Sequence, residues 1–200
     1  MKHIARRFSA VSSFAVLSLL GGCMGSRSEP PTCWLVSAEA AGTTQIREAA
    51  SRMPACIGAF AVRSPYDGVR MAVLRSDGSI AFDPANTFAA RPEMMLKCAA
   101  FDILASRGEL DFAGQTSGTN VVYDVSVTRL ALDCRKEGIR TASVGVTLAA
   151  KVVEGRGRPV STVICSAEGG SDAADGNYSA AFSKAFSTAL VRAYEGTKAR

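Results

Sequence analysis

Apolar and polar residues alternate along much of the second half of the chain, and a period of two is typical of β-strands that bury one face. Three successive runs show this pattern, with short turns between them. The runs are residues 121–132, 144–152 and 160–167, and the turns are residues 135–138 and 154–158. Because the turns are short, we expect the runs to pair as an antiparallel meander.

The first half carries shorter apolar runs. The strands expected here are residues 32–36, 56–62, 71–74 and 80–82. Asp77 and Gly78 separate the last two, and an Asp-Gly pair between strand-like runs is a strong β-hairpin cue. The sequence therefore predicts a hairpin at this pair, whereas the Ala-rich residues 37–53 are expected to form a loop with one helical turn at most.

Two segments have helical spacing. The first begins at Pro92, whose missing N–H costs nothing in the first helical turn, and ends before Gly108. Its apolar face is expected to comprise Met94, Cys98, Phe101 and Ala105, widened by Met95, Leu96, Ile103 and Leu104. The C-terminal helix has an apolar stripe of Tyr178, Phe182, Ala185, Phe186, Ala189, Leu190 and Ala193, with Ser183, Lys184, Thr188 and Arg192 expected outside. We expect a single α+β domain over residues 32–200, with both helices on one face of an antiparallel or mixed sheet.

The N-terminus reads as an export signal. Lys2, Arg6 and Arg7 precede an apolar run over residues 8–20, and Leu20-Gly-Gly-Cys23 follows. This ending resembles the bacterial lipobox, in which the cysteine is acylated and becomes the new N-terminus. Residues 1–22 are therefore predicted to be a lipoprotein signal peptide and residues 23–31 a lipidated flexible tether. The alternatives are a plain secretory peptide and a transmembrane helix, but the apolar run is short for a span of ~30 Å.

Composition excludes several classes of function. The chain has 23 Lys+Arg and 18 Asp+Glu, and three of the basic residues leave with the signal, so no basic footprint for nucleic acid remains. The only histidine, His3, leaves as well, so the mature chain has no Ser-His-Asp triad and no histidine metal ligand. We expect no enzyme activity, no cofactor and no metal site. Carboxylates that converge in space are the one enzymatic alternative left open.

Five cysteines remain after Cys23, and an odd number leaves at least one unpaired in an oxidising compartment. The predicted meander places Cys165 opposite about Leu148 and Cys134 opposite about Thr141. These points are ~23 Å apart along the middle strand, so no bond between the two cysteines is expected. Cys98 is expected to be a reduced core thiol, and Cys33 with Cys56 is the pair favoured if any forms.

The central region resembles the ABC-type transport auxiliary lipoprotein family, which includes the paraquat-inducible C-type lipoproteins. Residues 57–78 read as a strand, a turn containing Tyr66, and a strand that ends at Arg75 before an acidic hairpin. Phe88 and Ala89 then lead to the Pro92 helix start, where the family usually has Trp in place of Phe88. The order of elements matches over residues 33–193, and only the central part is specific.

The resemblance implies a protein that docks and does not catalyse. Its partners would be an ABC transporter and a mammalian-cell-entry-domain protein, which move phospholipid or other hydrophobic cargo between membranes. The lipid anchor would hold it at the periplasmic face of the envelope, and Met24 after the lipobox favours the outer membrane over the inner. A homo-oligomer stays open. So does a structural or assembly lipoprotein of another outer-membrane complex.

Overall fold

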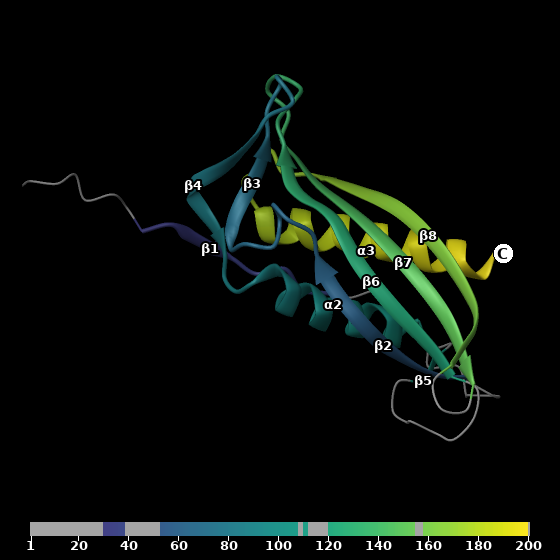
Figure 1. Ribbon diagram of the computed structural model, residues 1–200. Coiled ribbons are helices and arrows are strands. Elements are labelled where there is room, and N and C mark those ends of the chain that lie inside the picture. Colours follow the sequence, from purple (N-terminus) through teal and green to yellow (C-terminus); the bar gives the residue numbers. More distant parts are fainter. Residues whose placement is uncertain (1–29, 39–52, 108–109, 112–119, 155–157, 200) are drawn as a thin grey trace, which may run out of the picture. The chain divides into compact units, whose positions relative to one another are not determined.

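A computed structural model (Figure 1) describes residues 30–38, 53–107, 110–111, 120–154 and 158–199. From Pro31 onward the chain forms one unit. The strands are β1 (Thr32–Trp34), β2 (Met53–Val62), β3 (Arg70–Leu74), β4 (Ile80–Phe88), β5 (Leu110–Asp111), β6 (Asn120–Asp133), β7 (Thr141–Glu154) and β8 (Arg158–Asp172). The helices are α2 (Pro92–Ser106) and α3 (Tyr178–Lys198).

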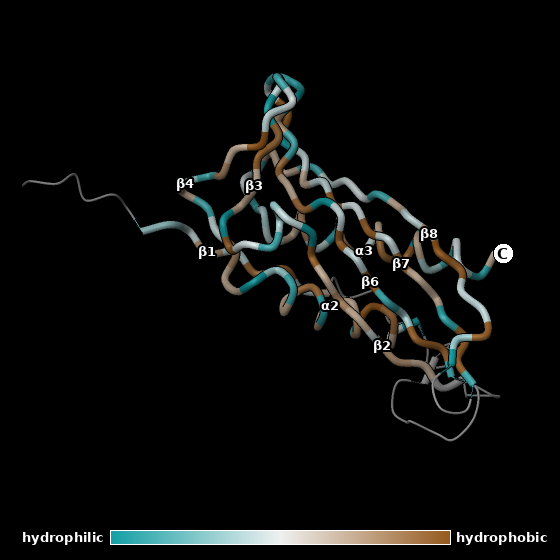
Figure 2. Tube along the Cα trace, viewed as in Figure 1, coloured by the Kyte–Doolittle hydropathy of each residue, from teal (hydrophilic) through white to brown (hydrophobic). Residues whose placement is uncertain are grey.

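The meander predicted from the alternating pattern is confirmed. β6 pairs antiparallel with β7, and β7 pairs antiparallel with β8. Cys165 lies opposite Leu148, as the turn positions predicted, and Thr141 lies opposite Asp133, one residue from Cys134. Figure 2 shows hydropathy alternating along these strands, which have one face toward the helices.

The other edge of β6 is shared by two strands. β2 runs parallel to the first part of β6, with Val62 beside Val127, and β3 runs parallel to its end, with Ala72 beside Ala131. The sheet is therefore mixed. β3 turns back into β4 through the predicted Asp77-Gly78 hairpin, where Gly78 has a φ of 81° that favours glycine. β1 completes this side by pairing parallel with β4.

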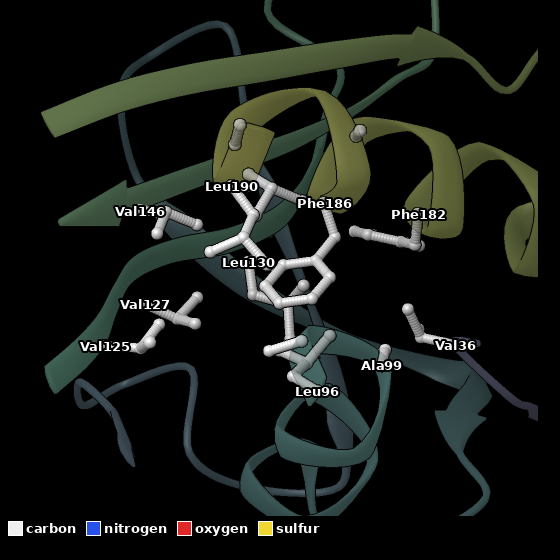
Figure 3. Close-up of a cluster of buried hydrophobic side chains, with 14 of the residues drawn as sticks. Val36, Leu96, Ala99, Val125, Val127, Leu130, Val146, Phe182, Phe186 and Leu190 are labelled. Carbon is white, nitrogen blue, oxygen red and sulfur yellow. The ribbon is translucent and has the colours of Figure 1, made fainter. Parts of the chain in front are cut away.

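Both helices pack on one face of the sheet, as predicted. α3 lies along β7 and β8, whereas α2 packs against α3 and β2. In Figure 3, Phe186 of α3 points between Leu96 of α2 and Leu130 of β6. These three side chains are at most 1% exposed, so the space between helices and sheet is filled by aliphatic and aromatic groups.

α3 approaches β8 closely at two glycines. A Cβ added to Gly169 would lie 2.0 Å from the carbonyl oxygen of Ala185, and one added to Gly196 would lie 2.2 Å from the Sγ of Cys165. Side chains at these positions would push the helix off the sheet. The stripe predicted for this helix, from Tyr178 to Ala193, is buried throughout.

The central line of the apolar face predicted for α2 is wrong, whereas the four residues expected to widen that face, Met95, Leu96, Ile103 and Leu104, are buried as predicted. Met94 is 68% exposed and Phe101 is 46% exposed, and Cys98 is also at the surface. The buried residues are Pro92, Met95, Leu96, Ala99, Ala100, Ile103 and Leu104. Apolar residues occur on every side of this helix, so spacing alone did not identify the side that meets the sheet.

The structure corrects the expectation for Ser183, and it shows that the conditional Cys33–Cys56 pair does not form. Ser183, expected outside α3, is buried, and its hydroxyl accepts a hydrogen bond from the backbone N–H of Ser37 at 3.1 Å. Cys33 and Cys56 are both free, as are Cys98, Cys134 and Cys165. Cys33 lies 3.6 Å from the hydroxyl of Thr87 instead. Most of residues 37–53, expected to form a loop, lie outside the described residues.

The close approach of α3 to Gly169 can be tested with a matched pair of substitutions. Gly169→Ala should lower the free energy of unfolding by about 1–3 kcal/mol, because its Cβ would overlap the backbone of α3. Gly170→Ala should change it by less than ~0.5 kcal/mol, since the nearest atom to that Cβ is the Thr141 Cγ2 at 3.5 Å. Urea unfolding of both variants measures this, and equal stabilities would contradict the close packing of α3 on β8.

A second pair of substitutions tests which sides of the two helices are buried. Phe186→Ala should cost about 3–5 kcal/mol of unfolding free energy, since a fully buried ring leaves a cavity. Phe101→Ala should cost less than ~1 kcal/mol, because its side chain is nearly half exposed. Thermal melting of the two variants decides between the buried and exposed faces; a large loss in Phe101→Ala would restore the face first predicted.

Candidate functional surfaces

The residues singled out by the family resemblance occupy two different places. Phe88 is buried and stacks edge-on against Phe182, with ring centroids 5.5 Å apart, and Pro92 is buried at the first turn of α2. Tyr66 is half-buried against the core in the turn before β3. Arg75 lies at the opposite end of β4, exposed at the hairpin. These positions therefore support the fold and do not form one site, and Cys23 lies outside the described residues.

The sheet face away from the helices carries rows of polar side chains across neighbouring strands. Asp124 of β6 forms an ion pair with Lys151 of β7. Thr147 of β7 and Ser166 of β8 share a hydrogen bond of 2.8 Å. Such cross-strand pairs keep this face soluble while the other face is buried.

Asp124 also holds an irregularity in β2 in place. Its Oδ1 accepts the backbone N–H of Ala59 at 2.8 Å, next to the register shift between Ile57 and Phe60. Partial burial alone would raise the pKa of this carboxyl. The pKa of Asp124 nevertheless lies below its usual value. It is lowered by the hydrogen bond from Lys151, by the backbone hydrogen bond from Ala59 and by the charge of the lysine, and together these outweigh the effect of burial.

A groove of about 540 Å³ opens on the same face, at the end where β6 turns into β7. Its lining residues come from β6, β7, β8 and the turn: Arg129, Asp133, Arg135, Lys136, Ile139, Thr141, Ser143, Glu168, Gly169 and Gly170. Arg129 pairs with Glu168 at 3.2 Å and Arg135 pairs with Asp133 at 2.6 Å. The hydrogen bond from Arg135 lowers the pKa of Asp133, so this acid stays ionised at neutral pH.

Three small residues, Ser143, Gly169 and Gly170, are among those that line the groove. Gly170 has no steric reason to be glycine, because a Cβ there would meet only ordinary van der Waals contacts. A larger side chain at that position would fill the groove without disturbing the core. The groove was not predicted from the sequence. It depends on the strand register, which places Arg129 beside Gly145 and Gly145 beside Glu168.

The chemistry available on the described surface is limited. In the described ranges no three His, Cys, Asp or Glu side chains come together in a way that could hold a metal ion. Burial raises the pKa of the Cys134 thiol, and it raises that of Tyr194 to about 12. Neither of the helices described is long and apolar enough to cross a membrane.

Comparison with known proteins gives a likeness of fold. No family model and no curated protein matches the chain. Protein XCC0632 from Xanthomonas campestris, described with the family model DUF330, is 16% identical, covers 84% of this chain and 90% of its own, and has a TM-score of 0.52. The crystal structure of an uncharacterized protein is 13% identical, covers 75% of this chain and 95% of its own, and has a TM-score of 0.54.

A third structure is less similar. It is the crystal structure of a candidate lipoprotein from Caulobacter crescentus CB15. That protein is 16% identical, covers 50% of this chain and 72% of its own, and has a TM-score of 0.35. The first two structures define the class of fold, an α+β domain of the kind found in the DUF330 protein.

The lowered pKa of Asp124 predicts how the free energy of unfolding depends on pH. A carboxyl whose folded-state pKa is depressed stabilises the fold above its unfolded pKa of ~3.9 and loses this effect as pH falls through the folded value. Asp124→Asn should therefore lower the unfolding free energy by about 0.5–1.5 kcal/mol at pH 7, and the difference from the parent should shrink toward pH 3. Urea unfolding at both pH values measures it. A difference independent of pH would contradict the role of the charge.

Proposed function

We propose that this protein is a lipid-anchored periplasmic auxiliary lipoprotein of a transport system with an ABC transporter and a mammalian-cell-entry-domain protein. Its cargo would be phospholipid or another hydrophobic molecule. The protein would act by docking to these partners and not by catalysis. The lipobox ending at Cys23 supports the anchor, and Met24 favours the outer membrane.

The filled interior supports docking most directly. A domain that carries a hydrophobic molecule needs an enclosed apolar space of about 300–1,000 Å³. Here the residues between the sheet and the helices touch one another, and Phe182, Phe186 and Leu190 are fully buried. A cargo molecule would have to displace this core, so the domain contributes a surface to the system.

The polar groove is the part of that surface best suited to a protein partner. It combines three cations, two carboxylates and the half-exposed Ile139 on a rigid sheet. Interfaces of this mixed kind give specificity through complementary charge.

The anchor is tested by feeding cells a labelled fatty acid. The full chain should become labelled and sediment with membranes, whereas Cys23→Ala should remain an unlabelled precursor. A wild-type protein that carries no label would overturn the lipoprotein assignment.

The docking role is tested by a photo-cross-linking amino acid at Ser143, which lines the groove, in the full chain expressed in its own cells. We expect cross-links to the mammalian-cell-entry-domain protein or the transporter, identified by mass spectrometry. The same probe at Lys184, on the exposed side of α3, is the matched control and should give none. Cross-links from Ser143 only to subunits of an unrelated outer-membrane assembly complex would overturn the transport assignment.

A further inference from the structure

Strand β8 forms one edge of the sheet, and it is much longer than the short strands at the other edges (Figure 1). It spans 15 residues and pairs on one side with β7, whereas no described strand pairs with its other side. β1 and β5 are only three and two residues long. A short edge strand offers few backbone groups to another chain, so the length of β8 is the exception in this sheet.

The longer strands with an open side carry features that discourage pairing. The part of β4 beyond β1 contains Asp83 and Pro84, and a proline cannot donate to a strand ladder. β2 has the irregularity between Ile57 and Phe60. In contrast, residues 161–167 of β8 contain no charge and no proline, and their register with β7 is unbroken. This stretch of β8 is therefore open to an added strand.

The open stretch is bounded at both ends. Before it, the register with β7 shifts beside Val160. After it, the carbonyl of Glu168 accepts a hydrogen bond of 3.2 Å from Nη1 of Arg192 in α3 and not from a further strand. Backbone groups of residues two apart in an antiparallel strand point to the same side, so those of Thr162, Ile164 and Ser166 point outward with that carbonyl.

Helix α3 covers one half of β8 and leaves the other half bare. It approaches the strand most closely where Ala185 meets Gly169 and where Gly196 meets Cys165, and it ends shortly afterwards. Residues 158–162 lie beyond that point, and each of them is exposed, whichever face of the strand its side chain lies on. The first part of β8 therefore has no described helix over the face that α3 covers further along.

We propose that β8 pairs antiparallel with β8 of a second copy of this chain, with Ile164 on the two-fold axis. This register overlaps the two open stretches completely, because residue 164 is the midpoint of residues 161–167. Ile164, which is 56% exposed in the single chain, then packs against Ile164 of the second copy. Thr162 lies opposite Ser166, and the overlapping stretches contain no charges that could repel each other.

The second copy also provides the helix that the first part of β8 lacks. The two strands run in opposite directions, so α3 of each copy lies next to the bare half of the other copy's β8. The two-fold relation uses the same surface on both chains, so the contact closes as a dimer and leaves neither β8 edge open. A strand from an unrelated protein would satisfy the backbone groups but would bring no such helix.

The register is tested by cysteine cross-linking in the full chain, purified in detergent. Under mild oxidation, Ile164→Cys should link two copies, because directly opposed, hydrogen-bonded residues have Cα atoms ~5.5 Å apart, within the range of a disulfide. Val160→Cys is the matched control, since Val160 is 54% exposed on the same strand. Its two copies would lie ~26 Å apart along the strands and should give at least tenfold less product.

Peptide mass spectrometry without reduction identifies which thiols are joined and separates these links from those of the native cysteines. A link between two residues 160 in place of two residues 164 would overturn the proposed register. Failure of both variants to link would overturn the pairing itself.

A charge at the centre of the contact tests the dimer independently. Ile164→Lys should raise the dissociation constant of the dimer at least tenfold in sedimentation equilibrium, because two lysines would meet on the two-fold axis. The matched control is Ile80→Lys, which changes a 40% exposed residue of β4 and should leave the dimer intact. Thermal melting shows that both variants are folded. A parent chain that sediments as a monomer would overturn the proposal.

The identity of the occupant is tested in the organism's own cells with a photo-cross-linking amino acid at Thr162. The product should contain two copies of this chain and no other protein. A product with a different protein alone would overturn the proposal and identify that protein as the donor of the added strand. The pairing does not depend on Cys23 or on a transport partner, so its failure would leave the proposed function unchanged.

Discussion

The fit of α3 against β8 is the contact on which the rest of the domain depends. Gly169 lets the backbone of the helix rest almost directly on the strand, and this sets how deeply Phe182 and Phe186 reach into the core. α2 packs against α3 and β2, so its position follows from the same contact. Removing volume in the core would loosen packing locally, whereas adding one methyl at Gly169 would lift the whole helix.

The two faces of the sheet lie in different environments, one buried and one exposed to solvent. One face buries aliphatic side chains such as Val127, Val144 and Val146 under the helices. The other carries ion pairs and hydroxyls in register, among them Asp124 with Lys151. A surface ion pair contributes little to stability by itself. The value of Asp124 lies in its second role, as the acceptor that keeps the irregular part of β2 in its place.

Much of this architecture follows from local pattern. The alternation of apolar and polar residues predicted the three strands of the meander, and the turn positions predicted that Cys165 lies opposite Leu148. The Asp77-Gly78 pair predicted the hairpin. Both signals act over a few residues, so a single sequence contains them. The exposed side of α2 could not be predicted, because apolar residues surround the helix and only tertiary packing selects the buried ones.

The pairing of β2 and β3 with one edge of β6, and the groove beside it, were also beyond local pattern. Parallel strands share no turn that fixes their partners, and the groove depends on which residues of three strands stand side by side. Of the residues that define the candidate surfaces, the sequence therefore indicated Cys23 but none that line the groove. Met94 and Phe101 were noticed and assigned to the wrong environment.

The shared edge of β6 also sets the order in which the chain can fold. β2 and β3 are made early, but the strand to which both must pair is made much later. Contacts of such large sequence separation slow folding, because a long loop must close before they form. Before β6 is present, the N-terminal half can form only its own pairings, such as the β3–β4 hairpin, and the edge that β2 and β3 share is missing. The domain therefore cannot complete its central sheet until more than half of the chain is available, so its folding is expected to be a late, cooperative event.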